Sequence, residues 1–261
     1  MRRAILRRVG VVLCAALALL AAVLIRPDPA FAHVREHRAF RVMSDRPIDP
    51  AIDRVLDDAM DRIARSTLYR PGERFRVFIC NDPWRMALFT RMPSAGGVTD
   101  MAVTRNIYLR QSDPARNRVV IPAEWGPLAD ADVRTLAYFI AHEATHVLQS
   151  RRLGRWRSLS APRWLREGHA DCVAKAGRFD RAANRASMRR GEYLLSEAYA
   201  RHGLYRRYHL MVAAQLDRPG ITVERLFADP PSVIEAARAA MTGDPAASRG
   251  SPEPDPIRTY L

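Results

Sequence analysis

The sequence predicts an α+β protein in which a small mixed sheet in the N-terminal half packs against an otherwise helical C-terminal half. Short strand-like segments rich in β-branched and aromatic residues are crowded before residue 122. After residue 130 the apolar residues recur with helical spacing instead. Without its first 32 residues the chain keeps about 230 residues, a length that suits one domain. We place an α/β lobe at 33–128 and a helical lobe at 129–242.

The first half is expected to begin with a strand and an amphipathic helix. Asp49-Pro50 opens this helix, with Asp49 as its cap, and its apolar stripe faces the core. The stripe consists of Ile52, Val55, Leu56, Ala59, Met60 and Ile63. The strands are expected at Phe40–Ser44, Phe75–Cys80, Val98–Val103, Asn106–Arg110 and Arg118–Ile121, with a short helix at 84–92 that Pro93 ends.

The second half is expected to be helical throughout. The first long helix covers about 131–152, with Asp130 as its cap and Gly154 just past its end. Later helices are expected at Pro162–Ala176, near 180–201 and 205–217, and as two short pieces within 222–241. Residues 243–261 contain four prolines and small polar residues, which predicts a disordered tail.

The N-terminus has the pattern of an export segment. Four arginines precede an apolar run from Val9 to Ile25, and the small-residue triplet Ala30-Phe31-Ala32 follows. Residues 1–32 are therefore either a signal peptide cleaved before His33 or a retained N-terminal transmembrane anchor. Both alternatives leave the arginines in the cytoplasm and place the rest outside it, as a periplasmic, secreted or anchored protein.

The charge of the chain bears on its partners. The formal net charge is +14, and residues 1–32 contribute five arginines and one aspartate, so the remainder carries 14 − 4 = +10. The arginines are spread along the chain without a basic cluster interleaved with aromatics, and export also argues against a nucleic-acid partner. The charge predicts electrostatic association with an anionic membrane or cell wall. The sequence does not indicate an oligomeric state.

Two cysteines remain once the leader is set aside. Cys80 and Cys172 form an even count in an oxidising compartment, so they can pair as a disulfide. They can equally be two separate buried thiols, and the sequence leaves both alternatives open.

The segment His142-Glu143-Ala144-Thr145-His146 carries the strongest chemical signal. Histidines at i and i+4 lie on one face of a helix, where both imidazoles can bind a single metal ion. Glu143 lies about a hundred degrees round the helix from His142, a position that suits a general base for a metal-bound water. The alternative is a chance pair of surface histidines beside an incidental glutamate.

A second segment supports the metal hypothesis. Trp164-Leu165-Arg166-Glu167-Gly168-His169-Ala170-Asp171 begins 164 − 146 = 18 residues after the second histidine, on the next expected helix. A helical hairpin would bring Glu167 to the metal as third ligand, with Asp171 orienting a liganding histidine. Gly168 would let the two helices approach closely. Taken alone, Glu167 would be interpreted as a solvated helix carboxylate. His169, two positions from Glu167, is interpreted as a packing histidine that points away from the site.

Together the two segments resemble the gluzincin metallopeptidases, a group of zincin-like enzymes that includes thermolysin. HExxH at His142–His146 and W-x-x-E-G-x-A at Trp164–Ala170, followed by Asp171, carry the resemblance, which covers about 75 residues. It implies that His142, His146 and Glu167 bind Zn²⁺, that Glu143 is the base and that Asp171 supports a ligand. A metzincin would need a glycine where Gln149 stands and a histidine where Arg152 stands.

Two further parts of a peptidase site can be sought in the sequence. Val98–Val103 is either an edge strand that pairs with an extended peptide substrate or an ordinary internal strand. A donor that stabilises the oxyanion is expected among five residues of the later helices, and we favour Tyr205 for its position. The five candidates are Tyr199, His202, Tyr205, Tyr208 and His209.

The leading hypothesis is an extracytoplasmic zinc metallopeptidase that hydrolyses a peptide or protein substrate. The runner-up is a catalytically inactive zinc-binding scaffold or binding module at the cell envelope. A basic envelope-binding protein without metal is the third hypothesis and needs the motif to be accidental. The sequence indicates neither the substrate nor endo- versus exo-cleavage.

Overall fold

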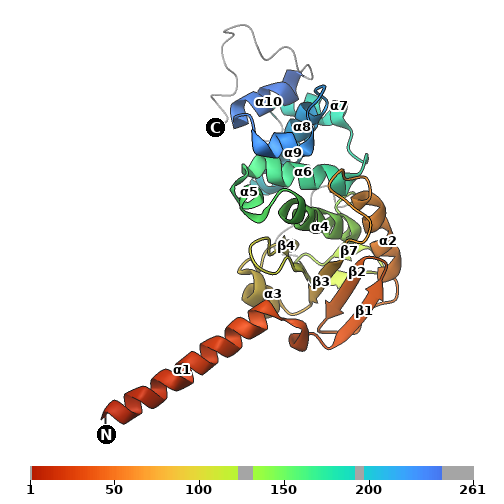
Figure 1. Ribbon diagram of the computed structural model, residues 1–261. Coiled ribbons are helices and arrows are strands. Elements are labelled where there is room, and N and C mark those ends of the chain that lie inside the picture. Colours follow the sequence, from red (N-terminus) through yellow and green to blue (C-terminus); the bar gives the residue numbers. More distant parts are fainter. Residues whose placement is uncertain (1, 123–131, 192–196, 243–261) are drawn as a thin grey trace.

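The computed structural model describes residues 2–122, 132–191 and 197–242, with side chains for 8–122, 132–191 and 205–242. It shows the expected α+β architecture, with a five-stranded mixed sheet in the N-terminal half and helices in the C-terminal half (Figure 1). The predicted tail at 243–261 and the predicted cap Asp130 lie outside the described residues.

The sheet has the strand order β1-β2-β3-β5-β4. The three inner strands are parallel, with Phe40 opposite Phe75 and Val77 opposite Ile107 in the register, whereas β1 and β4 pair antiparallel at the two edges. A separate two-stranded sheet, β6 with β7, follows β5. The strands are β1 His33–His37, β2 Phe40–Ser44, β3 Phe75–Cys80, β4 Gly97–Thr99, β5 Ile107–Arg110, β6 Ser112–Asp113 and β7 Arg118–Val119.

One face of the sheet is covered by α2 (Ile52–Ile63) and α4 (Leu136–Arg152), which together form the main hydrophobic core. All six residues of the predicted α2 stripe are buried, which confirms that prediction. The helix begins at Ile52 with Ala51 as its cap, not at the predicted Asp49-Pro50. Asp49 instead accepts a hydrogen bond from the Ala51 backbone N–H (2.8 Å) and turns the chain into the helix.

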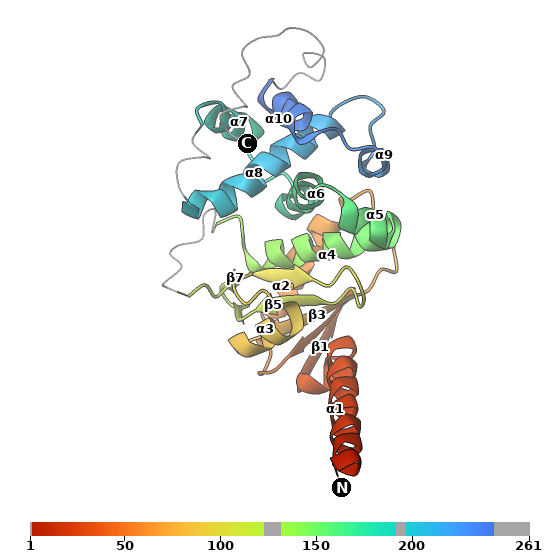
Figure 2. The ribbon, with the colours of Figure 1, turned by 90° about the vertical axis from the view of Figure 1, so that its left-hand side faces the viewer.

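The other face carries a smaller second core beneath α3 (Pro83–Thr90). Its buried members are Phe31, Met43, Phe78, Cys80, Met86 and Tyr108. Ahead of this core, α1 (Arg2–Ile25) projects away from the domain (Figures 1 and 2). The window Arg8–Ile25 is long and apolar enough to cross a membrane, a property that a signal sequence and an anchor share.

The helical half is stacked on α4. α6 packs against α4 on one side and against α8 on the other, so that α4 lies between the sheet and α6 (Figure 2). α5, α7, α9 and α10 surround this stack. Their bounds are α5 Arg155–Ser160, α6 Arg163–Lys175, α7 Arg181–Arg189, α8 Glu197–Leu216, α9 Val223–Ala228 and α10 Val233–Thr242.

Three further predicted boundaries are wrong, each for a local reason. α4 begins at Leu136 and not near 131, because the Thr135 side chain accepts from the Tyr138 backbone N–H and caps the helix. β4 stops at Thr99, because the Asp100 carboxylate accepts from the backbone N–H groups of residues 102–104 and turns the chain. The helix expected over 180–201 is divided, since α7 ends at Arg189, while α8 begins at Glu197 and includes the helix expected at 205–217.

The two cysteines are separate thiols, so the disulfide alternative is wrong. Cys80 belongs to the second core, whereas Cys172 on α6 packs against the main core on the other side of the sheet. Burial raises the pKa of the Cys80 thiol to about 12, which keeps it protonated.

Candidate metal centre

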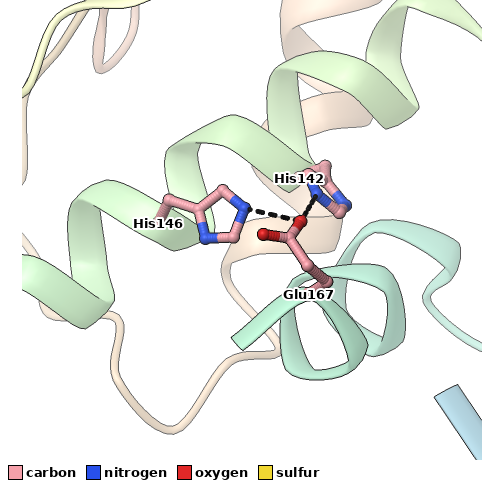
Figure 3. Close-up of side chains that lie close together, drawn as sticks. All are labelled: His142, His146 and Glu167. Carbon is pink, nitrogen blue, oxygen red and sulfur yellow. Dashed lines mark hydrogen bonds and ion pairs between the residues drawn. The ribbon is translucent and has the colours of Figure 1, made fainter. Parts of the chain in front are cut away.

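The centre is built on α4, which brings the two histidines of the motif to one face. His142 and His146 are one helical turn apart, and their ring centroids lie 4.9 Å from each other. Both rings are buried, because α4 is enclosed between the sheet and α6. Figure 3 shows the two imidazoles projecting from α4 toward Glu167 on α6, as the spacing of the two segments predicted.

The Glu167 carboxylate meets both imidazoles through one oxygen. Its Oε2 atom lies 3.3 Å from His142 Nε2 and 3.4 Å from His146 Nε2. These contacts are long for direct hydrogen bonds, whose usual N···O distance is about 2.9 Å. Ligand atoms bound about 2.1 Å from a tetrahedral zinc ion are separated by roughly 3.4 Å. The two contacts are therefore long hydrogen bonds, and their spacing also suits three ligand atoms of one shared metal ion.

The second oxygen of Glu167 is held by its neighbour in sequence. Arg166 Nε donates to Glu167 Oε1 (3.2 Å), and Arg166 Nη1 donates to the Leu159 carbonyl (3.3 Å). Burial alone would raise the pKa of Glu167, but the charge and hydrogen bonds of the two histidines outweigh it and lower that pKa well below its usual value. Arg166 thus leaves Oε2 as the oxygen that faces the imidazoles.

His146 is oriented by a chain of hydrogen bonds that the sequence analysis missed. Its Nδ1 atom donates to Gln149 Oε1 (2.9 Å), while Gln149 Nε2 lies within hydrogen-bond distance of the Arg166 carbonyl (3.0 Å) and of His169 Nδ1 (3.1 Å). Burial lowers the pKa of His169 to about 3, so its neutral Nδ1 can accept this bond. Because Gln149 keeps a proton on Nδ1, Nε2 is the nitrogen of His146 that gives up its proton when a metal binds.

We expect Gln149→Leu to weaken zinc binding by about ten- to a hundredfold, because it removes the acceptor that fixes the His146 tautomer. Competition with a chromophoric chelator measures the dissociation constant. Gln215→Leu is the matched control, because Gln215 is a buried glutamine on α8 that accepts from Arg218. Equal zinc affinity in Gln149→Leu and wild type would show that Gln149 does not support the ligand.

Glu143 faces the edge strand β4. Its Oε2 atom accepts a hydrogen bond from Thr99 Oγ1 (2.8 Å), and the carboxylate is largely buried. A Cβ atom on Gly97 would lie only 2.9 Å from Glu143 Cγ, so glycine at this position lets the strand pass close to the carboxylate. β4 ends the strand order of the described sheet, which places it at the edge, one of the two predicted alternatives.

Tyr205 is the oxyanion candidate that lies beside the centre. Its ring is 5.7 Å from the His142 ring in a T-shaped arrangement. Burial, followed by the negative charge of Glu167, raises the pKa of Tyr205 well above its usual value, so the hydroxyl keeps its proton. His209 is bound elsewhere, and the side chains of Tyr199 and His202 lie outside the described residues. The catalytic role of Tyr205 stays a prediction.

Asp171 does not orient a liganding histidine, so this part of the predicted site is wrong. Its carboxylate is bound by Tyr138 Oη (2.5 Å), His209 Nδ1 (2.9 Å) and Lys175 Nζ (3.0 Å). His142 Nδ1 has no hydrogen-bond partner within the described part of the chain. Tyr138, one turn before His142 on α4, reaches the carboxylate instead, and Asp171 thereby connects α6 with α4 and α8.

Replacing Asp171 by Asn should therefore cost stability more than metal affinity. Burial opposes ionisation of Asp171, but the Lys175 charge and two hydrogen bonds outweigh it and hold its pKa below the usual value. The variant leaves the buried Lys175 ammonium without its counter-ion, which typically costs about 3–5 kcal/mol. Chemical denaturation measures this loss. Unchanged stability together with a large loss of zinc affinity would show that Asp171 orients a liganding histidine, as the sequence predicted.

Gly168 permits a close approach, but not between the predicted pair of helices. A Cβ atom there would lie 2.4 Å from the backbone oxygen of Tyr208 and 2.8 Å from Val212 Cγ2, both on α8. Gly168 is one residue, or about 100° of helix rotation, from Glu167, so it faces away from α4. The glycine therefore allows α6 and α8 to pack closely.

Zinc affinity should rise with pH up to about pH 9. Burial alone would lower the pKa of metal-free His146, but the charge and hydrogen bond of Glu167 outweigh it and raise the pKa to about 9. Below that pH, zinc must displace a proton from Nε2, so affinity should increase about tenfold per pH unit. Calorimetric titrations at several pH values check this. An affinity independent of pH between 6 and 8 would contradict the proposed contact of His146 with the metal.

No protein-family model matches the chain, and a search of curated proteins finds no match.

Proposed function

We propose that this protein is an extracytoplasmic zinc metallopeptidase with a zincin-like fold that hydrolyses peptide bonds. The observation that carries the proposal is the placement of Glu167 Oε2 at nearly equal distances from the two Nε2 atoms, with Glu143 beside them. Two imidazoles and one carboxylate leave a tetrahedral zinc one open position, as catalytic zinc sites require.

Zinc bound to these three residues would polarise a peptide carbonyl and lower the pKa of a water molecule. Glu143, next to His142 on α4, is the base that takes a proton from water and passes it to the leaving amine. Thr99 holds the Glu143 carboxylate through its hydroxyl, so one oxygen of the base is fixed and the other is available. Tyr205 is proposed as the donor to the developing oxyanion.

The edge strand β4 supports a peptide as the substrate. Gly97–Thr99 pairs with β5 on one side, and its other side has no partner strand within the described residues. An extended peptide can add to such an edge through backbone hydrogen bonds, which would lay its scissile bond alongside Glu143. Since Thr99 contacts Glu143 directly, the strand and the base share one wall of the site.

Hydrolysis of a mixed peptide library by the purified protein tests the proposal. Activity should be lost with a chelator and restored by zinc. A protein that binds zinc but hydrolyses no peptide would instead be the inactive scaffold. Two histidines and one carboxylate also suit iron. If Fe²⁺ but not zinc restored peptide hydrolysis to the chelated protein, zinc would be refuted as the cofactor.

A further inference from the structure

The short segment between α1 and the first strand is part of the folded domain. The Asp28 carboxylate accepts a hydrogen bond from Arg76 on β3, and the Ala30 carbonyl accepts one from Arg85 on α3. β1 begins at His33, directly after this segment. Residues 28–31 therefore contact two elements of the domain before the sheet starts.

Phe31 makes the strongest of these attachments. Only 3% of the residue is exposed, and its ring centroid lies 5.0 Å from that of Phe78 and 5.7 Å from that of Phe89. Cleavage before His33 would remove this ring and leave a cavity in the second core, a large loss for so small a cluster. The folded domain therefore includes residues 28–31, which cleavage before His33 would remove.

Retention of this segment fixes the domain close to the membrane that α1 enters. The apolar window Arg8–Ile25 has 18 residues, none of them buried, and would span about 27 Å as a helix. Ile25 and Phe31 are six residues apart, so they can be separated by no more than about 22 Å even if the chain is extended. The second core therefore lies next to the lipid surface.

The surface of α3 is suited to that position. Trp84 and Leu88, one helical turn apart, are 56% and 36% exposed, and Met92, just past the end of the helix, is 54% exposed. We call these three residues the α3 patch. The Arg85 guanidinium lies over both the Trp84 ring (4.6 Å) and the Phe31 ring (5.5 Å), so the patch adjoins the attached segment. Figures 1 and 2 show α3 at the end of the domain from which α1 leaves.

We propose that α1 is retained as a membrane anchor and that the α3 patch rests in the interface of the same bilayer. Tryptophan prefers the headgroup region, where its ring is partly buried and its N–H stays hydrated. Arg26 directly follows the apolar window, and Arg91 precedes Met92 of the α3 patch, so both positions carry a positive charge that anionic lipid attracts. The arrangement holds α4, with its metal ligands, on the far side of the sheet from the membrane (Figure 2), and it does not depend on the proposed peptidase activity.

Intact-mass analysis of the exported full-length protein tests retention. The chain should be found in the membrane fraction, be released by detergent but not by salt, and have the mass of the uncleaved sequence. A soluble chain that begins at His33 would overturn the proposal.

Fluorescence quenching of the full-length protein tests docking. The protein is reconstituted in phosphatidylcholine–phosphatidylglycerol vesicles with brominated acyl chains, which quench tryptophans that reach the lipid. Trp84→Phe should lose most of the quenching seen in wild type. Trp156→Phe should retain it, because Trp156 is 80% exposed but lies on α5 in the helical half. Unchanged quenching in Trp84→Phe would overturn the docking, and would mean that the patch faces water or another protein.

Discussion

Glu143→Gln is expected to lower the rate of peptide hydrolysis by about a hundred- to ten-thousandfold while zinc stays bound. Glutamine keeps the shape of the side chain and can still accept the Thr99 hydrogen bond, but it cannot take a proton from water. The proposed ligands His142, His146 and Glu167 are untouched, so metal affinity should remain close to that of wild type. Turnover and zinc content measured on the same preparation separate the two effects.

Glu73→Gln provides the matched control. Glu73 is another buried carboxylate, and it is held by Arg151 and Arg152 at the end of α4. Its replacement should cost stability without abolishing hydrolysis. If Glu143→Gln retained the wild-type rate, or if it lost its zinc, Glu143 would not be the base.

Glu167→Gln should have the opposite signature, with a fall in metal affinity of more than about a hundredfold. Loss of a residue that only supports a ligand typically costs ten- to a hundredfold, and a ligand should cost more. The amide also lacks the negative charge that favours both the metal and the Arg166 contact. Because metal binding is linked to folding, the melting temperature measured with saturating zinc should fall toward that of the metal-free protein.

Calorimetric titration with zinc measures this loss. Glu235→Gln is a suitable control, because Glu235 is an exposed glutamate that bonds only locally with Ser232 among the described residues. If Glu167→Gln bound zinc as tightly as wild type while Glu143→Gln did not, the two glutamates would have exchanged roles.

The parts of the fold that the sequence predicted well depend on local pattern. Phe75–Cys80 has the β-branched and aromatic content of a buried strand, and its bounds were predicted without error. The α2 stripe follows the period of 3.6 residues, so its burial was predictable. The boundaries that failed depend on a few local hydrogen bonds, such as those of the turn at Asp100 and the one at the Thr135 cap, which nearby polar residues could equally have made.

The candidate site likewise has residues that local sequence pattern predicted and residues whose roles depend on tertiary packing. His142, His146 and Glu167 were predicted to converge because helical spacing and a hairpin of two helices suffice to bring them together. Gln149, Arg166 and Thr99 were missed because their roles depend on how α4, α6 and the sheet edge pack. The role of Asp171 was predicted wrongly because α8 supplies His209, a contact that no spacing along the chain reveals.

The central claim is that His142, His146 and Glu167 bind one zinc ion, and the metal content of the purified full-length protein tests it most directly. Plasma mass spectrometry should find about one zinc per chain in wild type, as for a single tetrahedral site. The variant with all three residues replaced by alanine should contain almost none. Wild-type protein that stays free of metal after incubation with zinc, or a triple variant that binds zinc as wild type does, would contradict the claim.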